Sequence, residues 1–188
     1  TKNTMHDLYW LRESGMEKKI KQLVHQGTSL LMGICGGFQM MGQTLSDPHC
    51  IEWEGKMQGM DLLPLRTVFE EMKVRSRVCG RILPVSTEGN QIFQALAGST
   101  FTGYEIHMGR TERLQETGAL TLLTHLDDGT GQQDGCVSGN CMGTYVHGIF
   151  ESGTFRNNLL QLLFDRRGLV WNGKKQMDYL SYKNRQYD

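Results

Sequence analysis

The chain has 188 residues and no net charge at pH 7, because 20 Lys and Arg balance 20 Asp and Glu. This length suits one domain with a sizeable core, so we predict one domain over residues 1–170 and a polar tail over 171–188. No basic stripe stands out and no apolar run reaches the roughly 20 residues of a membrane span, so nucleic acid and membrane are not expected partners. Five scattered cysteines without a disulfide pattern favour a reducing, cytoplasmic location.

The first predicted element is a helix that begins near Thr4. Asn3 or Thr4 can cap it, apolar residues recur along one face, and Gly27 can end it. Residues 29–34 are then predicted to form a buried strand and residues 38–45 a second helix. This helix–strand–helix order is typical of an α/β protein with a parallel sheet.

The remaining chain is predicted to be mostly strands. Residues 46–60 resemble a loop, and strands are expected within 62–83, 101–110, 120–125 and 142–146. Polar turns are expected over 86–91 and 127–135. Residues 155–164 are predicted to form a helix, since their leucines recur at helical spacing.

The most informative segment is 33–42, where a single cysteine lies among glycines between the predicted strand and helix. Glycines permit a sharp turn and close approach of a substrate to the main chain. Cys35 would begin the helix, where free N–H groups and the helix dipole favour a thiolate and can stabilise an oxyanion. The pattern predicts a cysteine nucleophile on a strand-to-helix elbow. Cys50 and Cys79 lie in ordinary contexts and are interpreted as packing residues.

A cysteine nucleophile needs a base to accept its proton. His147 is the preferred candidate, because it follows the β-like run 143–146 and precedes Gly148, at a strand end where α/β folds place functional side chains. No metal site is predicted, because Cys136 and Cys141 have no second Cys/His pair at zinc spacing. The other histidines considered are His6, His25, His49, His107 and His125.

Three segments carry a resemblance to a known family: Gly-Ile-Cys-Gly-Gly-Phe-Gln-Met-Met-Gly at 33–42, Gly-Tyr-Glu-Ile-His-Met-Gly-Arg-Thr at 103–111 and Gly-Thr-Tyr-Val-His-Gly-Ile-Phe at 143–150. Together with 59–64 and 134–138, they resemble the glutamine amidotransferase domains of cobyric acid synthases, in the same order. The resemblance implies an α/β fold, a flavodoxin-like class I glutaminase sandwich with a mostly parallel central sheet.

The resemblance also implies residue roles. Cys35 matches the family's nucleophile and His147 its base, and they would act as a dyad because Ile149 stands where many class I glutaminases have Glu. What orients the imidazole is open, with Glu105 and Glu151 as candidates. The residues that the resemblance places around the substrate are Gly36 and the backbone near Thr1 as oxyanion donors, Gln39 as a glutamine contact, and Tyr104, Glu105 and His107 in a substrate-holding loop. For Glu105 and His107, a hydrogen-bonded pair behind the site is an equal alternative.

The start of the chain resembles the family's Pro-Gly-Thr-Lys-x-Thr turn without its Pro-Gly, so we expect the N-terminal strands and a P-loop synthetase domain to be missing. The resemblance implies that ammonia from glutamine passes to that synthetase domain. There ATP and magnesium would be used to amidate a corrinoid acceptor in cobalamin biosynthesis. This domain itself would need no cofactor. Three alternatives remain: the glutaminase subunit of a cell-wall (lipid II) amidating ligase, a catalytically silent flavodoxin-like module, and a cysteine hydrolase acting on another substrate.

Overall fold

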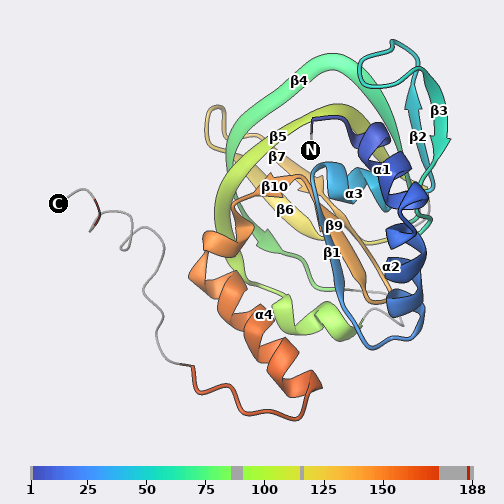
Figure 1. The fold of residues 1–188 in the computed structure, drawn as a ribbon. Helices are drawn as coiled ribbons and strands as arrows, with labels where there is room; N and C mark the ends of the chain where they lie inside the picture. The colour runs from blue at the N-terminus through green and yellow to red at the C-terminus, as the bar shows by residue number, and fades with distance from the viewer. Residues whose placement is uncertain (1, 86–90, 115–116, 174–185, 187–188) are drawn as a thin grey trace.

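The structure is a computed structural model that describes residues 2–85, 91–114, 117–173 and 186. Its helical elements, shown in Figure 1, are α1 (Thr4–Glu13), α2 (Met16–His25), α3 (Gly36–Met40), α4 (Gly153–Arg166) and the 3-10 turns η1 (Gln91–Leu96) and η2 (Ile149–Glu151). Thr1, most of the expected turn at 86–91 and most of the expected tail at 171–188 lie outside the described residues.

The beginning of the chain forms two helices, where one was expected. Asn3 caps α1 by accepting a hydrogen bond from the His6 backbone N–H at 2.7 Å. The break falls at Gly15, whose φ of 76° lies in the left-handed region that glycine adopts without steric cost. The chain therefore turns between α1 and α2, at a glycine that the sequence analysis did not treat as a break.

A small sheet carries the elbow segment. It consists of β1 (Leu31–Ile34), β9 (Cys141–Thr144) and β8 (Cys136–Ser138), in the order β1-β9-β8. The first two strands are parallel, and the last two form an antiparallel hairpin. Leu31 pairs with Cys141 and Ile34 with Thr144, so the end of β1 lies beside the segment that leads to His147.

A larger sheet is built around two long strands, β4 (Leu65–Ile82) and β5 (Thr100–Arg113). They pair antiparallel over most of their length, with a register shift between Val68 and Lys73. The sheet has the order β10-β5-β4-β2-β3, and β6 pairs with both β4 and β7. The shorter strands are β2 (Thr44–Asp47), β3 (Gly55–Gln58), β6 (Thr121–His125), β7 (Gly131–Asp134) and β10 (Val146–His147).

The direction of the strands differs from the expected mostly parallel sheet. Within the described residues only the pairs β1–β9 and β2–β4 run parallel, whereas the other pairs are antiparallel. Parallel neighbours require long crossovers, usually helical, but most connections between β3 and β9 are short. Two expected loops also contain strands, since β3 lies within 46–60 and β7 within 127–135.

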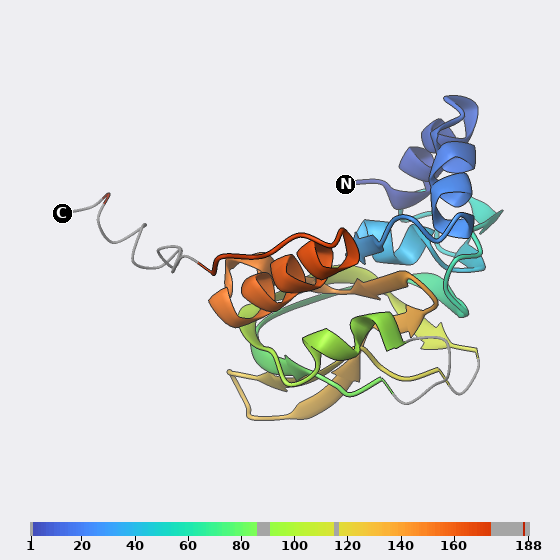
Figure 2. The ribbon, with the colours of Figure 1, turned by 90° about the horizontal axis from the view of Figure 1, so that it is seen from below.

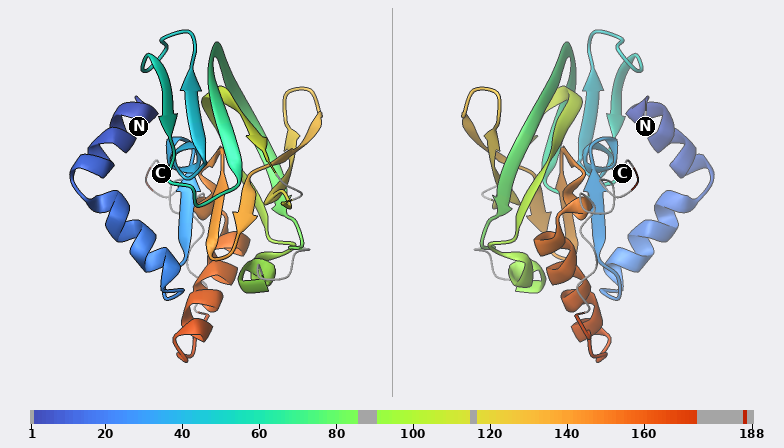
Figure 3. Two further views of the ribbon diagram at one scale, coloured as in Figure 1. Left: turned by 90° about the vertical axis from the view of Figure 1, so that its right-hand side faces the viewer. Right: turned by 90° about the vertical axis from the view of Figure 1, so that its left-hand side faces the viewer.

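The elements form layers. Figure 3 shows α1 and α2 on one side, the small sheet and the β2–β3 hairpin in the middle, and the rest of the large sheet on the other side. Figure 2 shows α4 and η1 next to each other, where they cover the same end of the region between the two sheets. The main core lies there, and its fully buried members include Val78, Phe93, Leu123, Val146 and Phe155. The active-site elements thus rest on a packed interior rather than on loops alone.

One glycine on β9 is required by the packing of the elbow. The ring of Phe38, which is 2% exposed, lies where a Cβ on Gly143 would be, so a side chain there would clash. At Gly131 on β7, by contrast, the nearest atom to an added Cβ is the Leu123 carbonyl oxygen at 3.7 Å, an ordinary contact.

We therefore expect Gly143→Ala to lower the free energy of unfolding by about 1–3 kcal/mol, the usual cost of overpacking a core. Urea unfolding followed by circular dichroism measures this change. Gly131→Ala is the matched control and should unfold within about 0.5 kcal/mol of the parent chain, as surface substitutions usually do. Equal unfolding midpoints for the two variants would contradict the packing described here.

Candidate active site

Cys35 lies at the sharp turn between β1 and α3. Its φ of 54° and ψ of −115° are unusual for a residue with a side chain, and such strain is typical of functional turns. The turn is held by the backbone, since the Cys35 N–H donates to the Thr144 carbonyl and the Cys35 carbonyl accepts from the Gln39 N–H, both at 3.0 Å. Gly33 permits the close approach of α3 to β1, because an added Cβ would lie 2.7 Å from the Phe38 backbone nitrogen.

The predicted nucleophile and base meet at one main-chain atom. The Cys35 thiol donates to the Ile106 carbonyl oxygen at 3.4 Å, and Nε2 of His147 lies 3.3 Å from the same oxygen. His147 ends β10, which pairs with β5 so that His147 is opposite Tyr104. Three segments far apart in the sequence therefore converge where the sequence predicted a catalytic pair.

The protonation of both groups follows from their surroundings. Burial raises the pKa of the Cys35 thiol, and the backbone N–H of Gly36 offsets only part of this effect. The expected thiolate is thus disfavoured, since α3 has five residues and contributes little dipole. A carbonyl oxygen only accepts hydrogen bonds, so Nε2 of His147 carries a proton in this state.

Gln39 is buried beneath the elbow, with 2% of its surface exposed. Its side-chain nitrogen donates to the Met108 carbonyl at 2.9 Å and to the Tyr145 hydroxyl at 3.1 Å, while its oxygen accepts from the Thr4 hydroxyl at 3.2 Å. Glu52 in turn accepts from the Thr4 backbone N–H and holds the start of α1. The predicted contact of Gln39 with glutamine would require one of these bonds to be exchanged.

The three residues predicted on β5 lie on opposite faces of the strand, because side chains alternate along it. Tyr104 is 49% exposed and shares a face with its cross-strand partner His147. Glu105 points to the other face, is 3% exposed and bonds Nε2 of His107 at 3.1 Å. Glu105 therefore does not orient His147, and Glu151, the other candidate, lies beside Gly148.

Two participants were missed by the sequence analysis. Tyr145 is 5% exposed, and its ring stacks on His107 with centroids 3.6 Å apart. Burial raises the pKa of the Tyr145 hydroxyl, which stays protonated and contacts Thr111 and Gln39. The Ile106 carbonyl belongs to the main chain, so no residue type could have indicated it. The only signal for Tyr145 was its place two residues before His147.

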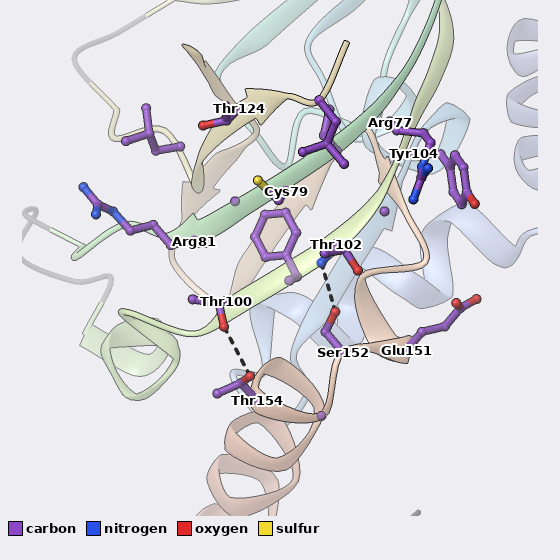
Figure 4. A pocket seen from close by; sticks show the side chains of 17 residues that line it. Arg77, Cys79, Arg81, Thr100, Thr102, Tyr104, Thr124, Glu151, Ser152 and Thr154 are labelled. Atoms are coloured by element: carbon purple, nitrogen blue, oxygen red, sulfur yellow. Dashed lines mark hydrogen bonds between the residues drawn. The ribbon is translucent and has the colours of Figure 1, made fainter. Parts of the chain in front are cut away.

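A cavity of about 860 Å³ lies on the outer face of β4, β5 and β6, beside the start of α4 (Figure 4). The Ser152 hydroxyl accepts from the Thr102 N–H at 3.1 Å at its wall. Cys35 and His147 do not line this cavity, although Tyr104 does. We take Cys35 and His147, and not the cavity, as the candidate site, because the predicted nucleophile and the predicted base share a hydrogen-bond partner there.

In the part of the chain that the structure describes, no group of three or more His, Cys, Asp or Glu side chains is arranged to hold a metal ion. None of the helices in this part is long and apolar enough to cross a membrane.

Comparison with known proteins identifies first the class and then the family. A solved structure described as a crystal structure of glutamine amidotransferase matches with a TM-score of 0.51 and 17% sequence identity, covering 86% of this chain and 73% of that chain. The expected class I glutamine amidotransferase fold is thus confirmed. Residues 1–155 match the family of CobB/CobQ-like glutamine amidotransferase domains, and the chain belongs to this family.

Curated relatives agree with this assignment. The chain is 40% identical over 190 residues to a cobyric acid synthase of Ruminiclostridium cellulolyticum, covering 100% of this chain and 36% of the relative. It is 39% identical over 176 residues to a cobyric acid synthase of Moorella thermoacetica, covering 90% of this chain and 32% of the relative. The chain therefore spans about a third of the length of the curated relatives it matches.

The raised pKa of Cys35 gives a prediction about pH. A thiol reacts as its thiolate, so the rate of alkylation by iodoacetamide should keep rising above pH 9.0, the ordinary value for a cysteine thiol. Peptide mass spectrometry after timed labelling measures the rate at Cys35 across pH, with a short cysteine peptide as the reference. A midpoint for Cys35 below that of the reference peptide would contradict the effect of burial.

Proposed function

We propose that this chain is the glutaminase domain of a cobyric acid synthase and hydrolyses glutamine to supply ammonia. The observation that carries the proposal is the meeting of Cys35 Sγ and His147 Nε2 at the Ile106 carbonyl oxygen. Membership of the CobB/CobQ-like family and the names of the relatives support it. Within the larger protein, the ammonia would be used to amidate corrinoid side-chain carboxylates in cobalamin biosynthesis.

The proposed reaction starts at the side-chain amide of glutamine. Cys35 Sγ attacks the amide carbon while its proton passes to His147, and a tetrahedral oxyanion forms that the Gly36 backbone N–H stabilises. The carbon–nitrogen bond then breaks, His147 protonates the departing nitrogen, and ammonia leaves a glutamyl thioester on Cys35. Water, deprotonated by His147, attacks this thioester, the carbon–sulfur bond breaks, and glutamate leaves while His147 returns the proton to the Cys35 sulfur. The backbone near Thr1 stays a prediction for the second oxyanion donor, because residue 1 lies outside the described residues.

The resting site must change before the first step. Because Nε2 of His147 donates to the Ile106 carbonyl, the neutral imidazole has to move its proton from Nε2 to Nδ1, by exchange with water, before Nε2 accepts one from Cys35. We propose that glutamine, when it enters beside Cys35, displaces the shared contact with Ile106. Thiol and imidazole can then face each other directly, as proton transfer requires. Until that moment, burial raises the pKa of the Cys35 thiol and favours its protonated form.

The proposed partner is a P-loop synthetase domain that binds ATP, magnesium and the corrinoid acceptor. The support is the length of the relatives named cobyric acid synthase, of which this chain spans about a third. The same names favour this acceptor over the cell-wall alternative. The silent-module alternative makes a different prediction about the site, because an inert cysteine would need neither a strained backbone nor a histidine at the same carbonyl.

We expect Cys35→Ala to abolish glutamine hydrolysis and His147→Asn to reduce it by about 10²–10⁴-fold, the usual contribution of a general acid–base residue. A coupled glutamate assay on the purified chain measures both effects. Diazo-oxo-norleucine, a glutamine analogue that alkylates activated thiols, should add once to the parent chain at Cys35, and excess glutamine should prevent the addition. His25→Asn on α2 is the matched control and should retain the parent activity. Absence of both hydrolysis and labelling in the parent chain would support the silent module.

In a complete synthase, Cys35→Ala should eliminate glutamine-dependent amidation and spare amidation with ammonium salts, because the two reactions would occur at separate sites. The measurement is the ATP-dependent mass increase of a corrinoid acid, with lipid II as the competing acceptor. Loss of both activities together would argue against separate sites. Amidation of lipid II alone would replace the corrinoid assignment.

A further inference from the structure

In segment 105–109 of β5, alternate residues contribute different groups to the surroundings of the site. Its even residues give main-chain carbonyls to the site: that of Ile106 contacts Cys35 and His147, and that of Met108 accepts from the Gln39 side chain. Its odd residues Glu105 and His107 place their side chains on the opposite face, away from His147. The strand thus presents the site with backbone atoms whose positions depend on what holds the strand.

The sheet does not fully hold this segment. On the side away from β4, the strand β10 pairs only with Tyr104 and Glu105, and on the β4 side the register shifts between Met108 and Arg110. Gly109 also has a φ of 86°, a left-handed conformation that bends the strand at the same point. Without regular strand pairing on one side, the segment needs another restraint to keep its main-chain carbonyl groups in place.

His107 supplies a restraint along its own strand. Its Nδ1 lies 3.1 Å from the Gly109 carbonyl oxygen and its Nε2 lies 3.1 Å from Oε1 of Glu105. A carbonyl only accepts, so Nδ1 donates, and the proton between Nε2 and the carboxyl group is shared whichever of the two carries it. One imidazole therefore ties residue 105 to residue 109 across the two carbonyls that the site uses.

Glu105 is fixed in turn by neighbours from other strands. The side-chain nitrogen of Gln132 on β7 lies 2.9 Å from both carboxylate oxygens, and Nε2 of His125 on β6 lies 3.6 Å from Oε2. The His107 ring is stacked on Tyr145 at a 16° interplanar angle. Both members of the pair are nearly enclosed, with side-chain exposures of 8% for His107 and 4% for Glu105.

We propose that Glu105 and His107 are positioning residues that hold the carbonyls of Ile106 and Met108 where Cys35, His147 and Gln39 need them. They act through the main chain of β5 and do not touch the substrate. The inference rests on the proposed glutaminase function for its kinetic consequence. Its structural consequence, the placement of Cys35 beside His147, can be tested without that function.

The test uses two variants. His107→Phe keeps a ring over Tyr145 but removes both hydrogen bonds of the imidazole, and Glu105→Gln keeps the shape of the side chain but weakens its hydrogen bond with His107. We expect kcat for glutamine hydrolysis to fall about 10- to 100-fold with KM changed less than threefold, because small misplacements of reacting groups cost this much. Glu17→Gln is the matched control, since Glu17 is a nearly buried, ion-paired carboxylate on α2, and it should retain the parent kcat.

The second readout is the rate at which iodoacetamide alkylates Cys35, with the exposed Cys50 as an internal reference. We expect this rate, relative to Cys50, to change at least threefold in His107→Phe and to stay constant in Glu17→Gln. An unchanged relative rate in both β5 variants, or a loss of thermal stability with parent kcat per folded molecule, would overturn the proposal. A parent chain without glutamine hydrolysis would refute the proposed function alone, because the alkylation rates still test the pair.

Discussion

The Ile106 carbonyl oxygen is the atom on which the arrangement of the site depends. It is the common hydrogen-bond partner of Cys35, which follows β1, and of His147, which ends β10. Neither side chain is fixed by a direct bond to the other in this state, so their distance is set by how three strands are placed. That placement comes from the parallel pairing of β1 with β9 and the antiparallel pairing of β10 with β5. The geometry of the site is therefore a property of the sheets.

Burial and reactivity oppose each other at Cys35. The elbow lies against Phe38 and Gly143 in a packed interior, and removal from water raises the pKa of the thiol more than the Gly36 N–H lowers it. A longer helix would shift this balance, because its dipole and free N–H groups stabilise a thiolate, but α3 ends at Met40. A nucleophile protected in this way depends on a correctly placed base. The alignment of His147 therefore matters more here than it would beside a preformed thiolate.

The sequence predicted which side chains lie together at the candidate site better than it predicted what surrounds them. Cys35 and His147 could be singled out as candidates because a cysteine among glycines after an apolar strand, and a histidine at a strand end, are local patterns. The face on which Glu105 lies depends on the pairing of β5 with β10, which is not local, so its relation to His147 could not be predicted. The same limit applies to the antiparallel sheet, since β4 and β5 pair across a long separation. The contribution of Ile106 was hidden for another reason: a main-chain carbonyl is present at every residue.

Gln39 shows how the elbow is joined to the rest of the domain. A buried amide is costly unless its donors and acceptor are paired, and here Thr4, Met108 and Tyr145 pair them. These partners come from α1, from β5 and from the residue between β9 and β10, so one side chain links three parts of the chain. The spacing of four residues places Gln39 about one helical turn after Cys35. The hydrogen bonds of Gln39 hold the turn in which the Cys35 backbone is strained. This network offsets the free-energy cost of that strain.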